Sequence, residues 1–386
     1  MKALVVDAEW KPRKNYLLNK DEEIKKRALV GSQVWCNPHF EIKDVPVPNV
    51  NDDEILIRVK ACGICGSDIH LYETDDKGFI IFSGLTRLPC ILGHEFSGEI
   101  VETGRNVSEF KKGDIVTGES IFWCGKCLPC RYGMLNQCEN IELMGLTADG
   151  AFSEYVAVKA KYCWSLNQLE KRFQRRDIFK IGALIEPLGC AYNGLFISGD
   201  GFHPGAHTIV YGAGPIGLCS IVLLKAAGAG IIIVVDIIDE RLQIARRLGA
   251  DYAFNLKNED KIVEHIMEIT DGWGADIQVE AAGAASQTIP IMQRLYSKRG
   301  KVIYMGRGDI SSSLDINRVV SGANSIIGSR GHSGYGIFPN IIRLIQGGKL
   351  KGIMEMITSV FHFQDILRAF SISTNKSDSK ILIEFD

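Results

Sequence analysis

Residues 208–217 read TIVYGAGPIG: a strand-like run is followed by Gly212, Gly214, Pro215, Ile216 and Gly217. The run predicts a buried strand, and the apolar residues that continue to Ala227 predict a buried helix. The glycines let the backbone turn tightly, approach a pyrophosphate and pack helix against strand, while the N–H groups at the start of the helix are free to bind phosphate. The segment therefore predicts a dinucleotide site.

A second strand supports this interpretation and indicates which dinucleotide binds. It covers Ile231–Val235 and ends at Asp236, nineteen positions beyond Gly217. A carboxylate there accepts hydrogen bonds from both ribose hydroxyls and repels a 2′-phosphate, which favours NAD over NADP. Arg241 also belongs to this candidate site, where it could stack on adenine, face solvent or accommodate a 2′-phosphate. The alternative is a glycine-rich turn in an unrelated α/β protein, with Asp236 capping a loop.

The surrounding sequence predicts an α/β protein with two parts of different texture. Six strand candidates alternate with amphipathic stretches such as Arg241–Leu248 and Lys261–Ile269, which is typical of a doubly wound parallel sheet. The six are Thr208–Tyr211, Ile231–Val235, Asp251–Phe254, Asp276–Glu280, Lys301–Met305 and Ser325–Ile327. Residues 1 to about 190 instead alternate strand candidates such as Ile55–Val59 and Phe152–Val158 with Gly, Pro and Asn turns, so we expect a mostly β part.

Length and composition exclude several classes of protein. The 386 residues correspond to about 2.6 average domains, and the apolar (46%) and charged (23%) fractions are those of a globular protein rather than a disordered or fibrous one. A net charge of −2, with no basic cluster, makes nucleic acid an unexpected partner. We expect a cytoplasmic protein without a membrane segment, because no run of eighteen apolar residues occurs and the eleven cysteines form an odd set.

Four cysteines lie close together in the sequence, at Cys124, Cys127, Cys130 and Cys138. Thiolates on short turns can converge on one tetrahedral zinc ion, and a shell of four cysteines leaves no open position for chemistry. The spacing therefore favours a structural zinc site, with an iron–sulfur cluster as the alternative.

A second group of candidate ligands is dispersed over the first half of the chain. It consists of Cys65, the pair His94-Glu95, and Glu186. One sulfur, one imidazole and one or two carboxylates can hold zinc with a position open for water or substrate, as catalysis requires. Each residue also has a simpler interpretation: Cys65 as a small buried group, His94 as a hydrogen-bonded core residue, and Glu186 as a surface carboxylate.

The glycine loop, the four cysteines and the dispersed candidate ligands all occur in this one chain. With Gly150–Tyr155 included, they extend from about residue 45 to 330, and the chain resembles the zinc-dependent medium-chain dehydrogenases. The resemblance implies a GroES-like catalytic domain (1–190), a Rossmann NAD-binding domain (191–330) and a C-terminal segment (331–386) that returns to the catalytic domain. It also implies two zinc ions per subunit, a catalytic one on Cys65, His94 and Glu95 with Glu186 as a fourth or exchanging ligand, and a structural one on Cys124, Cys127, Cys130 and Cys138.

The resemblance also implies a reaction. Glu95 after His94, and Glu186 before Pro187, are similar to polyol, threonine and glucose dehydrogenases, and the insertion Trp10–Val34 is similar to a cyclitol-oxidising branch of inosose and inositol type. We therefore expect a zinc-dependent NAD oxidoreductase that oxidises a secondary hydroxyl of a polyol or cyclitol to a ketone. The alternatives are the same chemistry on threonine, a sugar or a simple secondary alcohol, and, in another class, a catalytically silent nucleotide-binding protein.

Three residues complete the predicted chemistry. A zinc ion on Glu95 and its neighbours would lower the pKa of a substrate hydroxyl, and hydride would pass to the nicotinamide. Ser67 and His70, two and five residues beyond Cys65, would carry the released proton to solvent, unless they are a turn residue and a surface histidine. The resemblance further favours a homodimer or homotetramer that acts on a small polyhydroxylated molecule.

Overall fold

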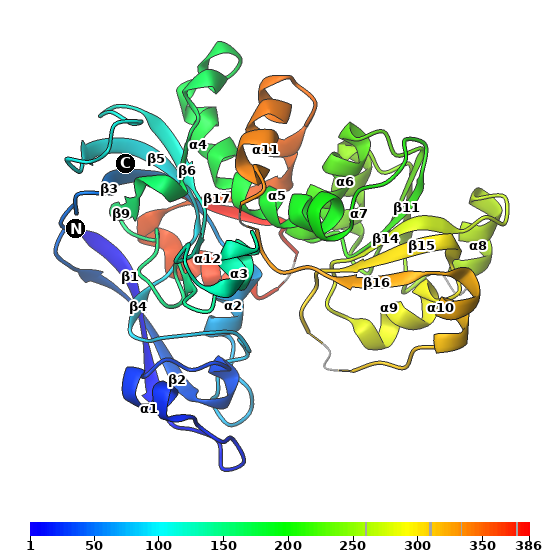
Figure 1. Cartoon of the computed structure of the whole chain (residues 1–386), viewed down its shortest axis with the longest axis horizontal. Helices are drawn as coiled ribbons and strands as arrows, with labels where there is room; N and C mark the ends of the chain where they lie inside the picture. The colour runs from blue at the N-terminus through cyan, green and yellow to red at the C-terminus, as the bar shows by residue number, and fades with distance from the viewer. Residues whose placement is uncertain (259–260, 309–310, 333, 376) are drawn as a thin grey trace. The chain divides into compact units, whose positions relative to one another are not determined.

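The computed structural model describes residues 1–258, 261–308, 311–332, 334–375 and 377–386, and its chain divides into two compact units (Figure 1). The first unit comprises Met1–Glu186 and Ser359–Asp386, and the second comprises Pro187–Thr358. Residues 331–358, which we expected to return to the catalytic domain, cluster with the second unit. A short helical turn, Ile353–Met356, packs there, and its Glu355 forms an ion pair of 2.7 Å with Arg247.

The second unit is built on a six-stranded parallel sheet with the order β13-β12-β11-β14-β15-β16. All six predicted strands are present, and β15 is longer than expected because it begins to pair with β14 before Lys301. Their bounds are β11 His207–Tyr211, β12 Ile231–Asp236, β13 Tyr252–Asn255, β14 Ala275–Glu280, β15 Tyr296–Tyr304 and β16 Ser325–Gly328. The order reverses between β11 and β14, so a crevice opens at the carboxyl ends of these strands, where dinucleotides bind in such folds.

Helices cover both faces of this sheet. In Figure 1, α6 (Pro215–Ala226) and α7 (Asp239–Leu248) lie on one side, and α9 (Ala285–Met292) and α10 (Ile316–Gly322) lie on the other. The predicted helix at residues 261–269 is α8 (Ile262–Ile269), whose Ile262, Val263 and Ile266 are buried in one apolar core with residues of β11, β12 and α9. Two further helices are α5 (Ile185–Tyr192), which contains the boundary between the units, and α11 (Ile337–Gln346).

The first unit is mostly β, as predicted. Its main sheet has the order β10-β6-β5-β3-β18-β17, with β9 also paired to β3, and a smaller sheet has the order β2-β1-β4. The strands are β1 Lys2–Trp10, β2 Trp35–Asp44, β3 Glu54–Gly63, β4 Cys90–Ile91, β5 Glu95–Thr103, β6 Ile115–Gly118, β7 Ile121–Phe122, β8 Glu142–Leu143, β9 Tyr155–Lys159, β10 Cys163–Ser165, β17 Ile357–His362 and β18 Lys380–Glu384. The last strand of the chain thus lies beside β3, one of its first.

The helices of the first unit are short. They are α1 Lys20–Lys25, α2 Gly66–Tyr72, α3 Leu128–Arg131, α4 Arg175–Ala183 and α12 Ile366–Ser373. The helix α4 packs on β3, β5 and β6, and α12 packs on α2 and β18. The ends of β3 and β5, together with α2, carry most of the candidate site residues of this unit.

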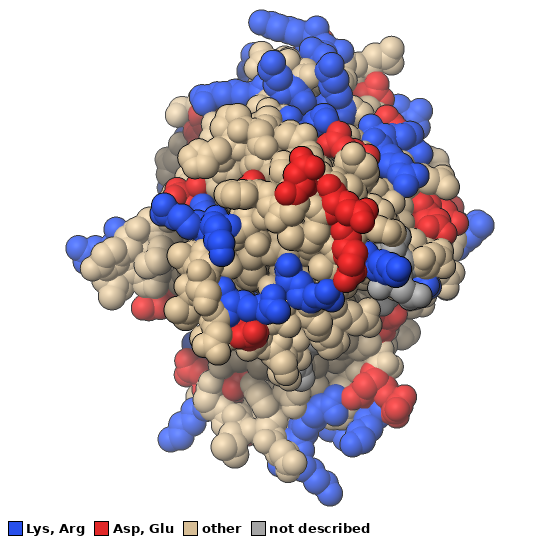
Figure 2. All heavy atoms as spheres, turned by 90° about the vertical axis from the view of Figure 1, so that its right-hand side faces the viewer, with Lys and Arg blue, Asp and Glu red and all other residues tan. Residues whose placement is uncertain are grey.

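On the face in Figure 2, basic and acidic side chains interleave, and neither sign covers it alone. Among the described residues no single helix is long and apolar enough to cross a membrane; the bent pair Arg175–Ala183 and Ile185–Ser198 meets the length and composition test only when taken together. Much of that pair, including Ile178, Ile181 and Leu188, is buried inside the protein.

Candidate active site

The turn from β3 into α2 positions the first candidate ligand. Cys65 is the extended residue that precedes α2, and its backbone N–H donates to Oδ2 of Asp68 at 2.9 Å. The Asp68 side chain is fully buried, so this capping bond is shielded from water. The start of α2 is therefore held rigidly, with the thiol of Cys65 at its end.

The pair His94-Glu95 is positioned by strand register. Glu95 begins β5 and lies opposite Gly63, the last residue of β3 and two positions before Cys65. Gly93, just before the pair, has φ +90°, and a side chain there would collide with the backbone of Phe152. Both the left-handed conformation and the close approach require glycine at this position. The antiparallel pairing of β3 and β5 thus brings the two motifs to one place.

The structure brings Cys65, His94 and Glu95 together. One ligand atom from each lies within 4.8 Å of the others, and this is one of two such groups in the described part of the chain. His94 and Glu95 are buried, and Cys65 is half-buried. A sulfur, an imidazole nitrogen and a carboxylate oxygen at this separation form a donor set that suits zinc and leaves a coordination position open.

The surroundings of His94 favour positive charge. Burial opposes a charge on the imidazole, but Asp68 and Cys65, with Glu186, raise the pKa of His94 well above its usual value. Nδ1 of His94 lies 3.8 Å from Oδ1 of Asp68, and burial raises the pKa of Asp68 to about 6. Neither of these two atoms has a hydrogen-bond partner in the described structure. A metal ion that made His94 more acidic would strengthen its interaction with this carboxylate.

Ser67 and His70 lie on α2, one turn of helix apart. Ser67 Oγ is 3.5 Å from Nε2 of His94, so the hydroxyl lies beside the ligand group. His70 is half-buried, and its backbone carbonyl accepts hydrogen bonds from Ile81 and Phe82 at 2.9 Å. Side chains three residues apart share one face of a helix. The placement is compatible with a proton path from the site along this face.

Glu186 lies outside the group of three. It is buried rather than at the surface, and its Oε1 accepts a hydrogen bond from Ser120 Oγ at 2.8 Å. Its charge nevertheless reaches His94, because it contributes to the raised pKa of that imidazole. The carboxylate is therefore near the candidate ligands, without being one of the three converging atoms.

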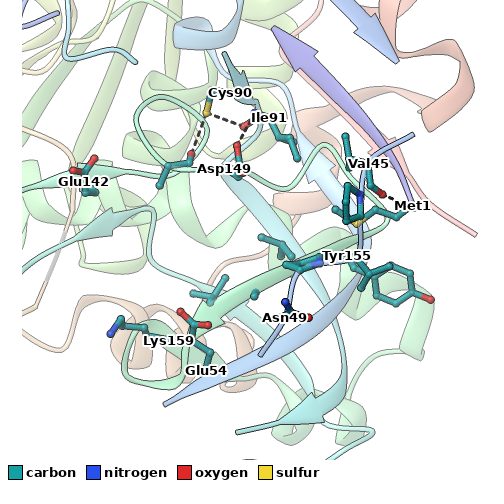
Figure 3. A pocket seen from close by; sticks show the side chains of 18 of the residues that line it. Met1, Val45, Asn49, Glu54, Cys90, Ile91, Glu142, Asp149, Tyr155 and Lys159 are labelled. Atoms are coloured by element: carbon teal, nitrogen blue, oxygen red, sulfur yellow. Dashed lines mark hydrogen bonds between the residues drawn. The ribbon is translucent and has the colours of Figure 1, made fainter. Parts of the chain in front are cut away.

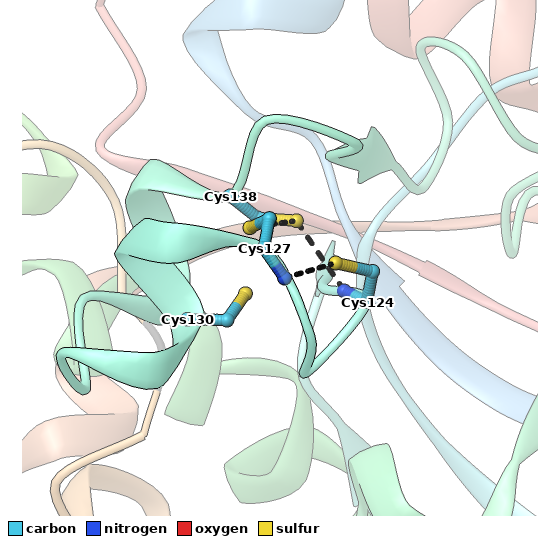
Figure 4. Close-up of side chains that lie close together, drawn as sticks. All are labelled: Cys124, Cys127, Cys130 and Cys138. Atoms are coloured by element: carbon cyan, nitrogen blue, oxygen red, sulfur yellow. Dashed lines mark hydrogen bonds between the residues drawn. The ribbon is translucent and has the colours of Figure 1, made fainter.

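The four-cysteine group is the second convergent set of ligand atoms. Sγ atoms of Cys124, Cys127, Cys130 and Cys138 lie within 4.8 Å of one another (Figure 4). Backbone N–H groups point at the sulfurs: Cys138 accepts from Cys124 and Asn140, both at 3.3 Å. Similar bonds from the backbone of Lys126 and Cys127 lower the pKa of Cys124 to about 6. Such a shell of thiolates is the arrangement of a closed, structural zinc site.

The glycine loop of the second unit fits a dinucleotide. At Gly217 a Cβ would collide with the carbonyl oxygen of Gly212, so only glycine allows α6 to approach β11 this closely. Gly212 itself has φ +93°. Gly214 precedes α6, and a Cβ there would have only the Arg241 guanidinium within 4 Å, so the loop is open on that side. Pro215 occupies the first helical position, as it commonly does.

Asp236 at the end of β12 is already hydrogen-bonded to the backbone. Its Oδ2 accepts from Ala213 N at 2.5 Å, and its Oδ1 accepts from Ile237 and Ile238 at 2.6 and 2.9 Å. The carboxylate therefore ties the glycine loop to the following turn. Each carboxylate oxygen has more than one acceptor site, so these bonds still leave lone pairs for ribose hydroxyls.

A pocket of about 870 Å³ lies elsewhere in the first unit (Figure 3). Its wall includes β4 and the loop at Asp149, whose Oδ1 accepts from Ile91 N at 3.0 Å, while Cys90 Sγ donates to Ile91 O and Ala148 O. None of the candidate ligands lines this pocket. The site is therefore defined by its converging ligand atoms and not by this cavity.

Sequence reasoning missed three residues of this site: Asp68, Ser120 and Lys380. The spacing of Asp68 three residues after Cys65 is that of a capping box, which is a local signal that could have found it. Ser120 and Lys380 have no such signal. The ammonium group of Lys380 donates a hydrogen bond to Glu95, which lies 285 positions earlier in the chain.

Comparison with known proteins decides the family. The model of the alcohol dehydrogenase GroES-like domain matches residues 51–168, and that of the zinc-binding dehydrogenases matches residues 215–347. A scyllo-inosose 3-dehydrogenase from Thermotoga maritima is 40% identical over 99% of both chains. The chain belongs to the zinc-binding alcohol dehydrogenase family. The predicted GroES-like and Rossmann parts are thereby confirmed, as is the prediction of an enzyme that acts on CH–OH groups.

Further relatives agree with this assignment. An L-threonine 3-dehydrogenase from Caldanaerobacter subterraneus is 33% identical over 87% of this chain and 93% of its own. A solved chain from Thermotoga maritima superposes with a TM-score of 0.95 at 37% identity, covering 99% of both chains. An alcohol dehydrogenase from E. coli CFT073, solved with NADH, gives a TM-score of 0.80 at 29% identity and covers 100% of this chain and 99% of its own. The protein is therefore a zinc-binding oxidoreductase that uses a nicotinamide cofactor.

Proposed function

We propose that the protein oxidises a secondary hydroxyl of a cyclic polyol, of inositol, inosose or aminocyclitol type, to a ketone, with NAD as hydride acceptor. The observation that carries the proposal is the convergence of Cys65, His94 and Glu95 within 4.8 Å in a family member that is related over its whole length to a scyllo-inosose 3-dehydrogenase. A catalytically silent nucleotide-binding protein would have no need to keep this donor set.

In this proposal the three residues would hold a catalytic zinc ion, with Glu186 as a fourth or exchanging ligand. When bound, zinc acts as a Lewis acid that makes the substrate hydroxyl easier to deprotonate. The carboxylate of Asp68, 3.8 Å from His94, keeps the imidazole oriented. Glu186 is held back by Ser120 at 2.8 Å, which suits a ligand that binds only part of the time. The four cysteines would hold a second zinc ion, which would stabilise the fold and leave no position open for chemistry.

Ser67 and His70 carry the proton away in this proposal. The Ser67 hydroxyl lies 3.5 Å from His94 Nε2, beside the point where a substrate oxygen would be held. It accepts the substrate proton and passes one onward, and His70, on the same face of α2, delivers it to solvent. The half-buried position of His70 suits a group that must reach both the site and water.

NAD is the proposed cofactor, with Asp236 as the selecting residue. Three backbone N–H groups donate to the carboxylate at the end of β12 and hold it in one orientation. It therefore cannot rotate to make room for the 2′-phosphate of NADP. A 2′-phosphate at that point would meet a buried negative charge, whereas two hydroxyls would find acceptors. Gly212, Gly214, Pro215, Ile216 and Gly217 hold the pyrophosphate at the start of α6, and the Arg241 guanidinium lies beside them.

We further propose a homodimer or homotetramer in the cytoplasm. The strand β16 ends the six-stranded sheet, and Ile326 on it is 42% exposed, as is expected of an edge that pairs with a second subunit. None of the eleven cysteines, all of which the structure describes, forms a disulfide, and a reducing compartment would keep them so. The proposed partner is a small polyhydroxylated molecule.

Threonine is the second candidate substrate, because an L-threonine 3-dehydrogenase is among the relatives that match most of the chain. It would use the same metal, cofactor and relay, so the site residues described above do not separate the two. Substrate assays must decide between them.

The test is a substrate panel followed by NADH formation, with NAD and NADP in separate reactions and with or without a zinc chelator. The panel contains myo-inositol, scyllo-inosose, an aminocyclitol, sorbitol, glucose, threonine and 2,3-butanediol. We expect activity with NAD on a cyclic polyol, lost after chelation. Activity confined to threonine or a linear alcohol would refute the cyclitol assignment, and activity insensitive to complete zinc removal would refute the metal assignment.

A further inference from the structure

A buried lysine lies against the proposed metal centre. Lys380 is 1% exposed, and its ammonium group donates to Oε2 of Glu95 at 2.5 Å and to the carbonyl of Ile64 at 2.9 Å. A lysine this deeply buried is rare unless it is paired, because removing its charge from water is costly. Glu95 is equally buried, at 1% exposure. The pair is therefore a specific interaction rather than a surface contact.

The fold supplies this lysine from the far end of the chain. The strand β18 pairs with β3 so that Leu382 lies opposite Gly63, and Ile64 N donates to Ile381 O at 3.0 Å. Lys380, at the start of β18, thus arrives beside the Gly63–Ile64 turn that leads to Cys65. The C-terminal strand and the ligand loop are parts of one sheet.

Gly63 completes the enclosure of the same oxygen. A Cβ built on Gly63 would collide with Oε2 of Glu95, while its other near neighbours are atoms of the same side chain. Oε2 therefore accepts from the Lys380 ammonium and leaves no room for a side chain at Gly63. With Oε2 occupied in this way, Oε1 is the oxygen that remains for a metal.

We propose that Lys380 is a positioning residue that fixes Glu95 as a one-oxygen ligand and so helps to retain the catalytic zinc. The inference rests on the proposed metal assignment of Cys65, His94 and Glu95. A carboxylate that is already hydrogen-bonded to an ammonium group keeps one orientation, whereas a free one rotates and can bind through either or both oxygens. Groups that orient metal ligands in this way commonly change metal affinity by about ten- to a hundred-fold when removed.

The rival explanation is a buried ion pair with a structural role only. In that case the loss of Lys380 would lower the stability of the first unit without altering the metal. A matched control exists at the other end of β18: Lys180 of α4 pairs with Glu384 of that strand at 3.3 Å, is mostly buried, and lies outside the ligand group. Its substitution removes a lysine–glutamate pair that also involves β18, without touching Glu95.

The experiment compares Lys380→Met, Gly63→Ala and the control Lys180→Met as full-length proteins. Catalytic zinc is replaced by Co(II), whose visible absorption reports ligand geometry, and the rate of metal release to EDTA is measured. We expect Lys380→Met and Gly63→Ala to change the Co(II) bands and to speed release about ten- to a hundred-fold, with Lys180→Met unchanged. Gly63→Ala displaces Oε2 and leaves the lysine in place, so it tests the same point if Lys380→Met fails to fold.

A double variant shows whether the lysine acts through Glu95. If it does, the double variant Lys380→Met/Glu95→Gln releases metal no faster than Glu95→Gln alone. Unchanged Co(II) bands and release rates in Lys380→Met or in Gly63→Ala would overturn the proposal. These readouts do not depend on a substrate, so failure of the cyclitol assignment in the panel leaves them interpretable. Absence of Co(II) binding by the unmodified protein would instead refute the metal assignment.

Discussion

Replacement of Asp68 by Asn tests the electrostatic design of the metal centre. Asn keeps the size of the side chain and an oxygen that can accept from Cys65 N, so the cap of α2 survives. The change removes the negative charge that faces Nδ1 of His94. We therefore expect a folded protein whose metal ligand His94 is less well held.

The separation of the two side chains sets the magnitude. Coulomb's law at 3.8 Å, with an effective dielectric constant of about 20, gives roughly 4 kcal/mol for two full charges. A metal-bound imidazole carries only part of a unit charge, so we expect about a third to two-thirds of that value. Since about 1.4 kcal/mol is a factor of ten, zinc affinity should fall about ten- to a hundred-fold.

The assay is zinc release into a chromogenic chelator, with the phase that accompanies loss of activity assigned to the catalytic site. Asp114→Asn is the matched control, because Asp114 is also a buried acid of the first unit that caps a loop, accepting from Lys111 N at 3.0 Å and Asn167 Nδ2 at 2.8 Å. We expect faster release from Asp68→Asn only. Equal release rates for the two variants would show that the carboxylate does not act on the metal centre.

Three further predictions follow from the structure. Ser67→Ala should lower turnover roughly a hundred-fold at unchanged zinc content, with activity recovered in Ser67→Thr; full turnover in Ser67→Ala would eliminate the relay. Cys127→Ser should lower the melting temperature and the zinc content before it alters the chemistry, and a stable, fully loaded but inactive variant would contradict a structural role. Glu384, despite its burial, has a pKa held below its ordinary 4.5 by Arg176 and Lys180, so its stabilising effect is present above that pH and is lost as the pH falls through the native pKa. Glu384→Gln should therefore flatten the acid limb of a pH–stability curve, and an unchanged limb would refute this.

Local patterns were sufficient to predict much of the fold. The six strands of the second unit are short apolar runs bounded by turns, and each was found within a few residues of its predicted place. The glycine loop is similarly local, because positive φ at Gly212 and close packing at Gly217 are demands on single residues. The first unit was predicted only as mostly β, since the antiparallel pairing of strands such as β3 and β18 joins residues more than 300 positions apart.

The candidate site also has a part that local motifs predict and a part that depends on tertiary packing. Motif spacing identified Cys65, the His94-Glu95 pair and the four cysteines as candidate ligands, because each motif is short and its residue types have a clear metal chemistry. Sequence could not show that Glu186 would be bonded to Ser120 or that Asp236 would be tied to Ala213, because those contacts depend on how separate segments pack.

The sequence by itself determined the family, the cofactor loop and the types of ligand, because these are properties of contiguous residues. Which atoms meet depends on long-range strand pairing: the register of β3 with β5 brings Glu95 to Cys65, and the register of β18 with β3 brings Lys380 to Glu95. A lysine near the end of a chain has no local feature that marks it as a partner of a metal ligand. Its role arises from burial beside one carboxylate oxygen, and burial is settled by the fold as a whole.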